Sequence, residues 1–353
     1  MALIILKQIL IMALYMLLGC LLYKKGKITE EGSKSIANLL AFLVIPMMLV
    51  NSFLVEYSPE KAQHLLISLG LGVLSLAVSI LIARILFPNS GVECFAAAFS
   101  NAGFIGIPLI SSVYGDEGVF FLVGLLMPYN VLQWNYGGWL LRRDVERAAA
   151  KAKEFAGATS AGDSAGGASA SAPAASNTSG NNGHSTSNVA SKNSGLAAAV
   201  KQVLLSPIII ASICGMIIFF SGLGSKVPYV VTGCVSGVAS INAPLAMIVL
   251  GVYLAQADVR ELLTNPRLYW ISFVRLIIIP IAIVLVFALI PAPTPIRMTM
   301  IIAGAAPVAA NAAVYSQIFG GDYVYGCKTV TQSTLLSIIS LPLIVMFADF
   351  IIH

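Results

Sequence analysis

The sequence predicts an all-α membrane protein of ten transmembrane helices, arranged as two inverted five-helix repeats. Of the 353 residues, 58% are hydrophobic and only 10% are charged, whereas an ordinary soluble domain has roughly 45–50% and about 25%. The charges cluster in short islands, and long uncharged runs separate them. A low-complexity stretch then divides these runs into two sets of five, which predicts the two repeats.

The ten runs have few or no charges, and most approach the roughly 20 residues that cross a hydrocarbon core of about 30 Å. The longest is interpreted as one tilted helix, because two helices and a turn need about 40 residues. Lysines follow the first run in place of a small-residue cleavage pattern, so we expect a retained helix and not a signal peptide. The runs are 8–23, 35–55, 65–83, 94–115, 118–141, 202–225, 227–257, 276–296, 298–321 and 329–348.

The low-complexity stretch covers 155–195 and consists almost entirely of Ala, Gly, Ser, Asn and Thr. Such a composition buries too little apolar surface to offset its ordering entropy, and it is typical of a flexible linker. We therefore expect an N-terminal repeat over 1–145, a linker over 146–199 and a C-terminal repeat over 200–353. Because each repeat has five helices, the second is inverted relative to the first, as in many secondary transporters.

The distribution of Lys and Arg predicts the orientation of the chain, because short cytoplasmic loops carry the excess of these residues. With both termini outside, sixteen of the 20 lie on the cytoplasmic side, together with the linker. The net charge of +5 fits this bias. No basic stripe with interleaved aromatic residues appears, so a nucleic-acid partner is not expected. The prediction is a multi-pass protein of the cell membrane.

The fourth and ninth runs share a pattern that predicts two broken helices. Pro108 and Pro307 each lie inside an apolar run, with Asn101 and Asn311 nearby, and both runs end in Gly-Asp. A proline removes one backbone donor and collides with the carbonyl four residues earlier, so both helices should break near the bilayer centre. The N-terminus of each second half would offer free amides and positive partial charge, which favours an anion.

Neutral amides beside the predicted breaks suit the binding of a carboxylate. Asn101 and Asn311 both donate and accept without the cost of a buried charge. Asn130 and Gln133, in the fifth run, are further candidate ligands, although such residues also simply join neighbouring helices. Tyr129 and Trp134 could stack on a planar ligand. The polar clusters of the fifth and tenth runs consist of Tyr129, Asn130, Gln133, Trp134, Asn135, Gln332, Ser333 and Thr334.

Arg275 is the one basic residue well inside an apolar stretch, and charge at such depth points to function. It is either a counter-charge for an anion or a side chain that extends to the cytoplasmic surface. Its position eight residues after Arg267, about 12 Å along a helix, favours the second interpretation. Glu93 is expected to mark the cytoplasmic start of the fourth helix. No carboxylate lies at the predicted breaks, which argues against a simple proton relay but leaves sodium coupling open.

Enzyme and cofactor signatures do not occur in the sequence. There is no His-Glu-x-x-His, no Gly-x-Ser-x-Gly and no Walker-type loop, and the five cysteines are isolated. We therefore expect no catalytic residue, metal site or cofactor. The leading interpretation is a secondary carrier of a small organic anion. A sodium- or proton-coupled symporter of organic acids, a channel and a membrane receptor are the alternatives.

Several short segments, in the order in which they occur along the chain, resemble those of the auxin efflux carrier family, and specifically of a bacterial-type member. The matching segments touch both repeats, and the resemblance covers the chain except for about 150–198. They are 101–109 with 115–116, 306–311 with 320–322, 45–46 with 242–244, and 128–130.

The resemblance implies broken fourth and ninth helices that cross at the substrate site. It also implies a homodimer through the first, second, sixth and seventh helices, and a transport domain of the other six that moves as an elevator. The family's substrates are carboxylates: auxins in plants, malate or malonate in bacteria. Asn101, Pro108, Pro307 and Asn311 take the crossover role, and Asn130 a role in substrate binding. The long linker departs from compact bacterial members.

Overall fold

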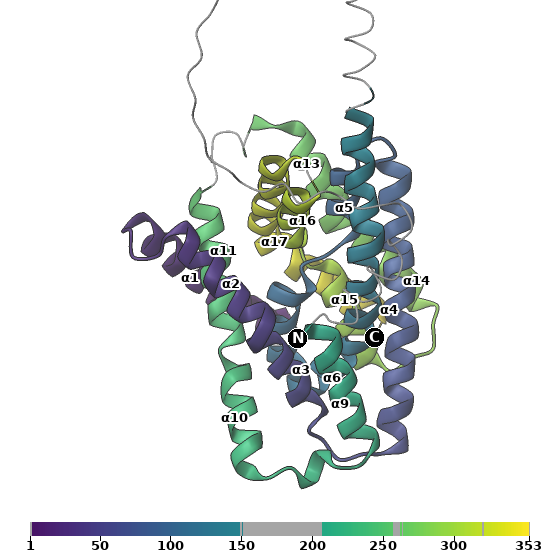
Figure 1. The fold of residues 1–353 in the computed structure, drawn as a ribbon. Helices are drawn as coiled ribbons and strands as arrows, with labels where there is room; N and C mark the ends of the chain where they lie inside the picture. The colour runs from purple at the N-terminus through teal and green to yellow at the C-terminus, as the bar shows by residue number, and fades with distance from the viewer. Residues whose placement is uncertain are drawn as a thin grey trace, which may run out of the picture.

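The computed structural model describes residues 2–148, 150, 207–256, 262, 264–319 and 321–352. Over these residues the chain is helical, apart from turns, short connections and one isolated antiparallel bridge (Figure 1). The predicted linker over 146–199 lies almost entirely outside the described residues. The all-α class is therefore confirmed for the described part of the chain.

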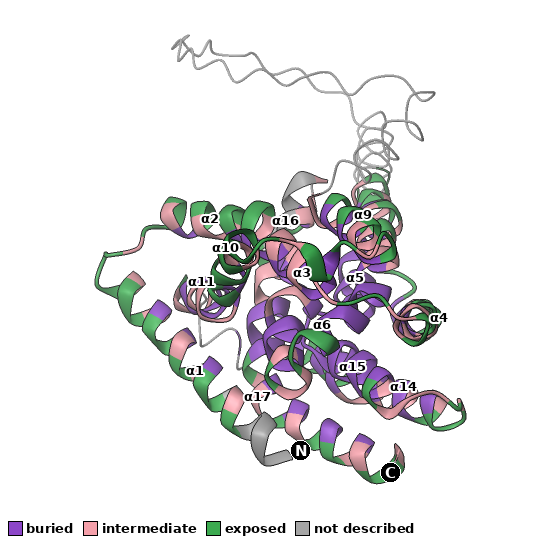
Figure 2. Ribbon diagram, turned by 90° about the horizontal axis from the view of Figure 1, so that it is seen from below, coloured by how far each residue is buried: buried purple, intermediate pink, exposed green. Residues whose placement is uncertain are grey.

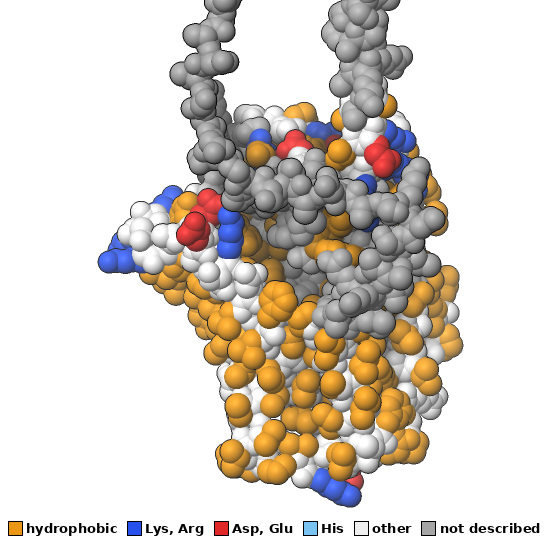
Figure 3. All heavy atoms as spheres, in the orientation of Figure 1, with side chains coloured by type: hydrophobic (Ala, Val, Ile, Leu, Met, Phe, Trp, Pro, Cys, Tyr) orange, Lys and Arg blue, Asp and Glu red, His pale blue; other side chains and the backbone are white. Residues whose placement is uncertain are grey.

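Helices long and apolar enough to cross a membrane number six among the described residues, and two shorter apolar helices, Leu10–Lys24 and Pro207–Phe220, accompany them. On the face that Figure 3 shows, apolar side chains cover the surface between the two ends of the molecule, and the charged side chains lie toward those ends. The chain is thus a multi-pass membrane protein. The six helices are Glu30–Phe53, Pro59–Leu86, Ala102–Ala148, Tyr229–Gln256, Pro266–Ala288 and Val324–Ile352.

The N-terminal part contains a sequence of helices interrupted by π-helical turns. Its elements are α1 (Ala2–Lys24), α2 (Glu30–Leu39), the π-turn η1 (Leu40–Val44), α3 (Ile45–Phe53), α4 (Pro59–Leu86), α5 (Gly91–Ala98), the π-turn η2 (Ala102–Gly106), α6 (Ile107–Leu132) and the π-turn η3 (Gln133–Gly137). The last helix continues to Ala148, and Gly115, with a φ of 61°, marks a kink inside α6.

The C-terminal part repeats this style of construction. Its elements are α9 (Pro207–Phe220), the 3-10 turn η5 (Gly224–Lys226), α10 (Tyr229–Ser240), α11 (Asn242–Gln256), α13 (Pro266–Phe273), the π-turn η6 (Val274–Ile278), α14 (Ile279–Ala288), α15 (Thr294–Ala305), α16 (Asn311–Ile318) and α17 (Tyr323–Ile352). Helices α10 and α11 together form one candidate span, as expected for the run over 227–257.

Three of the π-turns end directly before an Ile-Pro pair. They precede Pro46, Pro108 and Pro280. A proline cannot donate a hydrogen bond and collides with the carbonyl four residues earlier, and a wider turn in front of it relieves both problems. The prediction that Pro108 breaks its helix is therefore wrong, because the turn η2 accommodates this proline.

Glycines allow several helices to approach backbone to backbone, as is common in membrane proteins. A Cβ atom on Gly251 of α11 would lie 1.9 Å from the carbonyl oxygen of Met16 in α1, and one on Gly72 of α4 would lie 2.7 Å from the carbonyl oxygen of Gly124 in α6. Helix α3 packs against α9, where Phe53 lies against Gly215. These contacts place α1 beside α11, α4 beside α6 and α3 beside α9.

The most deeply buried part of the molecule is formed by α5, the first turn of α6 and α15, which Figure 2 shows in the middle of the helices. Every residue of α5 is buried. In α15 the run from Met298 to Ala305 is buried as well. Two short helices thus end at the centre of the protein and not at a membrane surface.

The eighth apolar run was placed too far along the chain. The structure gives one helix over Pro266–Ala288, whereas the run was expected at 276–296. Arg267 and Arg275 delayed the apparent start of the run, although both residues belong to this helix. Arg275 therefore lies in the middle of the helix and not near its end.

Candidate functional site

Two extended segments interrupt helices in the centre of the protein and pair with each other. One connects α5 to η2 through Phe99, and the other connects α15 to α16 through Pro307. The amide of Asn101 donates to the carbonyl oxygen of Pro307 at 2.7 Å, and the amide of Ala309 donates to that of Phe99 at 3.0 Å. Backbone groups at this depth need partners, and each break supplies them for the other. We call this pairing the crossing.

The predicted break in the second half lies where expected, whereas the first lies earlier. Pro307 is in the extended segment itself. In the fourth run the extended segment lies around Ser100, eight residues before Pro108. The amide of Val308 also donates to Ser333 Oγ of α17, at 3.1 Å. Pro307 thus belongs to the crossing, and Pro108 does not.

Arg275 lies against one side of the crossing and binds the ends of the two short helices. Its side chain is 1% exposed, and all three guanidinium nitrogens donate to backbone carbonyls at the ends of the two short helices. Nε bonds Ala306 at 3.1 Å, Nη1 bonds Ala97 at 3.0 Å and Ala98 at 3.4 Å, and Nη2 bonds Gly304. The expectation that Arg275 reaches the cytoplasmic surface is therefore wrong, because the carbonyls hold it in the interior.

This arrangement gives the crossing an electrostatic asymmetry. The C-terminal ends of α5 and α15 carry partial negative charge, and the guanidinium of Arg275 neutralises both. The N-terminal ends of η2 and α16, which carry partial positive charge, begin on the other side of the two breaks. Because Arg275 is engaged with carbonyls, it stabilises the crossing and is not presented as a free counter-charge.

Asn101 lies at the N-terminal end of η2 and is 4% exposed. Its Oδ1 accepts a hydrogen bond from the amide of Phe104 at 3.2 Å, as an N-cap residue does. Its Nδ2 is buried and has no partner among the described residues. A buried donor without a partner costs free energy, about 1–3 kcal/mol. The protein therefore has an unused donor at the crossing.

Asn311 and Gln133 meet beside the same crossing. Asn311 begins α16, and its Nδ2 donates to Gln133 Oε1 at 2.8 Å. Gln133 Nε2 donates to the hydroxyl of Tyr129 at 2.9 Å, and that hydroxyl donates to the carbonyl oxygen of Ser100. The structure thus brings four predicted site residues together at the crossing, namely Asn101, Gln133, Pro307 and Asn311.

Asn130 stands apart from this group. Its Nδ2 donates to the carbonyl oxygen of Leu126, one turn earlier in its own helix, at 2.7 Å. Pro108 likewise lies beyond η2. The structure therefore places neither residue in the hydrogen-bonded chain at the crossing.

An aromatic cluster lies beside the bond between Gln133 and Asn311. Tyr315 of α16 packs against Trp134 of η3 and Phe95 of α5, with ring centroids 5.1 and 5.8 Å apart. Phe99 and Phe319 extend the cluster. Apart from Trp134, sequence reasoning missed these residues. The pairs Phe95 with Phe99 and Tyr315 with Phe319, each four residues apart on a helix next to a break, were the available signal.

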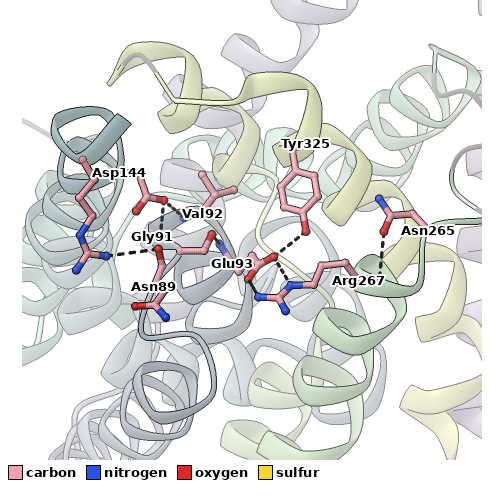
Figure 4. A network of polar contacts seen from close by, with 10 residues as sticks. Asn89, Gly91, Val92, Glu93, Asp144, Asn265, Arg267 and Tyr325 are labelled. Carbon is pink, nitrogen blue, oxygen red and sulfur yellow. Dashed lines mark hydrogen bonds and ion pairs between the residues drawn. The ribbon is translucent and has the colours of Figure 1, made fainter. Parts of the chain in front are cut away.

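The outer end of α5 is held by a second polar network (Figure 4). Glu93, 5% exposed, accepts hydrogen bonds from Arg267 Nε at 2.7 Å, from Arg267 Nη2 at 2.5 Å and from the Tyr325 hydroxyl at 2.9 Å. Asp144 Oδ2 accepts from the amides of Gly91 and, at 3.1 Å, Val92. Glu93 does mark the start of α5, and it also ties this helix to α13 and α17.

The crossing offers amide donors and positive helix ends, which suit a small anion. Groups of three or more His, Cys, Asp or Glu side chains that could hold a metal do not occur among the described residues. The arrangement presents amide donors and positive helix ends, whereas the guanidinium of Arg275 is turned toward backbone carbonyls.

Comparison with known proteins agrees with a role in transport. A family model described as membrane transport protein matches residues 4–345. The comparison with curated proteins gives no significant match. The matched family includes the auxin efflux carriers, so the resemblance in the sequence is confirmed at the level of the family. The chain therefore belongs to the membrane transport protein family, and it is a membrane transporter.

Proposed function

We propose that the protein carries a small organic anion with a carboxylate group across the cell membrane, and that the crossing binds this anion. The observation that carries the proposal is the buried Nδ2 of Asn101, which has no partner among the described residues. It lies at the N-terminal end of η2, where amides and the helix dipole favour negative charge. A carboxylate oxygen would supply the missing acceptor.

Arg275 supports this assignment from the opposite side of the crossing. By neutralising the carbonyl ends of α5 and α15, it removes the negative partial charge that would otherwise repel an anion. The site would then use positive helix ends on one side without competition from negative ends on the other. The roles of Asn101, Gln133, Pro307 and Asn311 as substrate ligands follow from this proposal, with Asn130 and Pro108 outside the innermost group.

We further propose two inverted repeats over 1–145 and 200–353, joined by a cytoplasmic linker over 146–199, with both termini outside. The packing of the described helices supports the repeats. Helix α1 lies against α11, and α3 lies against α9, so the first and second helices of one half each pack against the other half. Both halves also contain a helix that is interrupted at the crossing. A two-fold relation between the halves accounts for these matched features.

The proposed movement is an elevator in which the crossing shifts against a scaffold that contains α1 and α11. Two small pockets lie between α1 and α11 on one side and α17 on the other. Met12, Met16 and Met247 line them. Methionine is flexible and adapts to different neighbours. An interface lined by methionines therefore suits a scaffold and a transport domain that slide past each other. We also propose that the scaffold dimerises.

A transport screen in proteoliposomes tests the proposal. Mono- and dicarboxylates would be offered with and without a sodium or proton gradient. A carrier gives saturable uptake and counterflow, and a dependence on one gradient would identify a coupled symporter. Conductance without saturation, or ligand binding without translocation, would contradict the proposal.

A further inference from the structure

Two arginines converge on one exposed tryptophan at the end of α4. Arg84, in the last turn of α4, and Arg143, beyond η3, place their guanidinium carbons 5.7 and 5.0 Å from the ring centroid of Trp139. Trp139 is 46% exposed. Aromatic side chains of this kind gather at the headgroup level of a membrane. Like charges thus meet at an interfacial position.

Neither arginine forms a direct ion pair with a described carboxylate. The ion pairs within the described residues join Lys34 to Glu30 and Arg267 to Glu93, so no described carboxylate lies within ion-pair distance of Arg84 or Arg143. The nearby carboxylate of Asp144 accepts the amides at the start of α5 through its Oδ2 and attracts Arg143 only at longer range, so the two arginines keep a net positive charge.

Unused donors of the two arginines point to a missing ligand. Arg84 Nη1 and Arg143 Nε are both buried and have no hydrogen-bond partner among the described residues. Arg143 is held in place by its Nη2, which donates to the carbonyl oxygen of Pro88 at 3.1 Å. Two convergent guanidinium groups with free donors are the arrangement that binds a phosphate oxygen.

The surface next to the arginines is apolar. Leu81 and Ile85 of α4 flank Arg84 in the sequence and are 61% and 66% exposed. Leu81 lies on the part of α4 that leads from Arg84 toward the middle of the molecule, and Ile85, four residues later, lies on the same face of the helix. An anion with a long apolar tail matches this combination better than a free phosphate does.

We propose that Arg84, Arg143 and Trp139 form a binding site for the phosphate of an anionic lipid, with the acyl chain along Leu81 and Ile85. The site is separate from the crossing, and it does not depend on the identity of the transported solute. Because each basic side chain near an anionic surface adds about 1 kcal/mol, which is about fivefold in affinity, the pair should prefer an anionic lipid by roughly tenfold or more.

Quenching of tryptophan fluorescence by brominated lipids tests this site directly. The chain has three tryptophans, so Trp134→Phe with Trp270→Phe leaves Trp139 as the only one. In bilayers of phosphatidylglycerol and phosphatidylcholine, with one lipid brominated at a time, Trp139 should be quenched preferentially by brominated phosphatidylglycerol. Arg84→Gln with Arg143→Gln should remove the preference, and Arg84→Lys should retain most of it.

Trp270 provides the matched control. It is 41% exposed and lies in the first turns of α13, at the end of the molecule where Arg267 contacts α5, and none of the described arginines lies over its ring. The variant that keeps Trp270 alone should be quenched equally by the two lipids. This comparison needs no arginine substitution, so it decides the question even if the double arginine variant fails to fold.

Three results would overturn the proposal. Equal quenching of Trp139 by both lipids would show that the arginines bind no anionic lipid. An equal preference at Trp270 would show that the whole interface attracts anionic lipid without a site. Loss of the preference when inorganic phosphate replaces chloride at constant ionic strength would assign the site to a small soluble anion.

Discussion

The backbone amide of Asn101 donates to the carbonyl oxygen of Pro307 at 2.7 Å, and this bond joins two breaks that lie about two hundred residues apart in the sequence. The bond places the side chain of Asn101 at the crossing, where its Nδ2 remains unpaired within the described residues. The same pairing sets the N-terminus of α16, and therefore Asn311, against Gln133.

The bond between Gln133 and Asn311 should couple the two residues energetically. Gln133→Ala and Asn311→Ala remove the same hydrogen bond, so their effects on anion affinity should be less than additive. We expect a coupling energy of about 0.5–3 kcal/mol in a double-mutant cycle, as residues in contact usually show. Equilibrium binding of a labelled carboxylate measures it. Strictly additive effects would mean that the contact has no role in binding.

Arg275 should be required for stability. Arg275→Met would leave the carbonyls of Ala97, Ala98, Gly304 and Ala306 without this donor in the protein interior. Since a buried unsatisfied group costs about 1–3 kcal/mol, we expect a loss of at least about 3 kcal/mol. Thermal unfolding in detergent measures the change, with the exposed Arg147→Met as the control. Equal melting temperatures for the two variants would refute the role assigned to Arg275.

The two substitutions that break the ion pair between Glu93 and Arg267 should differ in their effect on stability. Arg267→Gln leaves a buried carboxylate without its ion pair, whereas Glu93→Gln leaves an arginine whose side chain is 57% exposed and can be hydrated. The arginine substitution should therefore destabilise the protein more, by about 1 kcal/mol once solvent screening is considered. Thermal unfolding of the two single variants and the double variant gives the comparison. A larger loss for Glu93→Gln would contradict this account.

The close contact of α1 with α11 should not tolerate a side chain at Gly251. Gly251→Ala would place a Cβ atom 1.9 Å from the carbonyl oxygen of Met16, so the helices would have to separate. Gly70→Ala in α4 is the control, because nothing lies within 4 Å of its Cβ position. Alanine there should be neutral or stabilise the helix by about 0.5–1 kcal/mol. The yield of folded protein after purification separates the two cases, and equal yields would refute the assigned contact.

Much of the architecture could be predicted from the sequence, because the bilayer imposes a simple pattern on apolar runs. The paired motifs around Pro307 and Asn101 identified the two interrupted helices. The exact position of the first break could not be predicted, because the effect of Pro108 depends on whether the preceding turn widens. The widened turn η2 leaves Pro108 in a continuous helix and moves the break to Ser100.

Contacts between the two halves were harder to predict. The sequence predicts Arg275 near a membrane surface, because the charge of Arg267 moves the predicted start of the helix further along the chain. Its partners are backbone carbonyls, which have no signature in a sequence. The bond from Gln133 to Asn311 and the ion pair from Glu93 to Arg267 join distant segments in the same way. Such pairings can be identified only from the structure, in which the two interrupted helices lie against each other.

Counterflow of a labelled carboxylate by Asn101→Asp in proteoliposomes is the most direct test of an anion site at the crossing. The substitution keeps an oxygen that can cap η2, but it replaces the free donor with negative charge. We predict that the variant inserts and folds normally and loses counterflow, while the exposed Asn135→Ala transports like the wild type. Wild-type counterflow by Asn101→Asp would contradict the central claim.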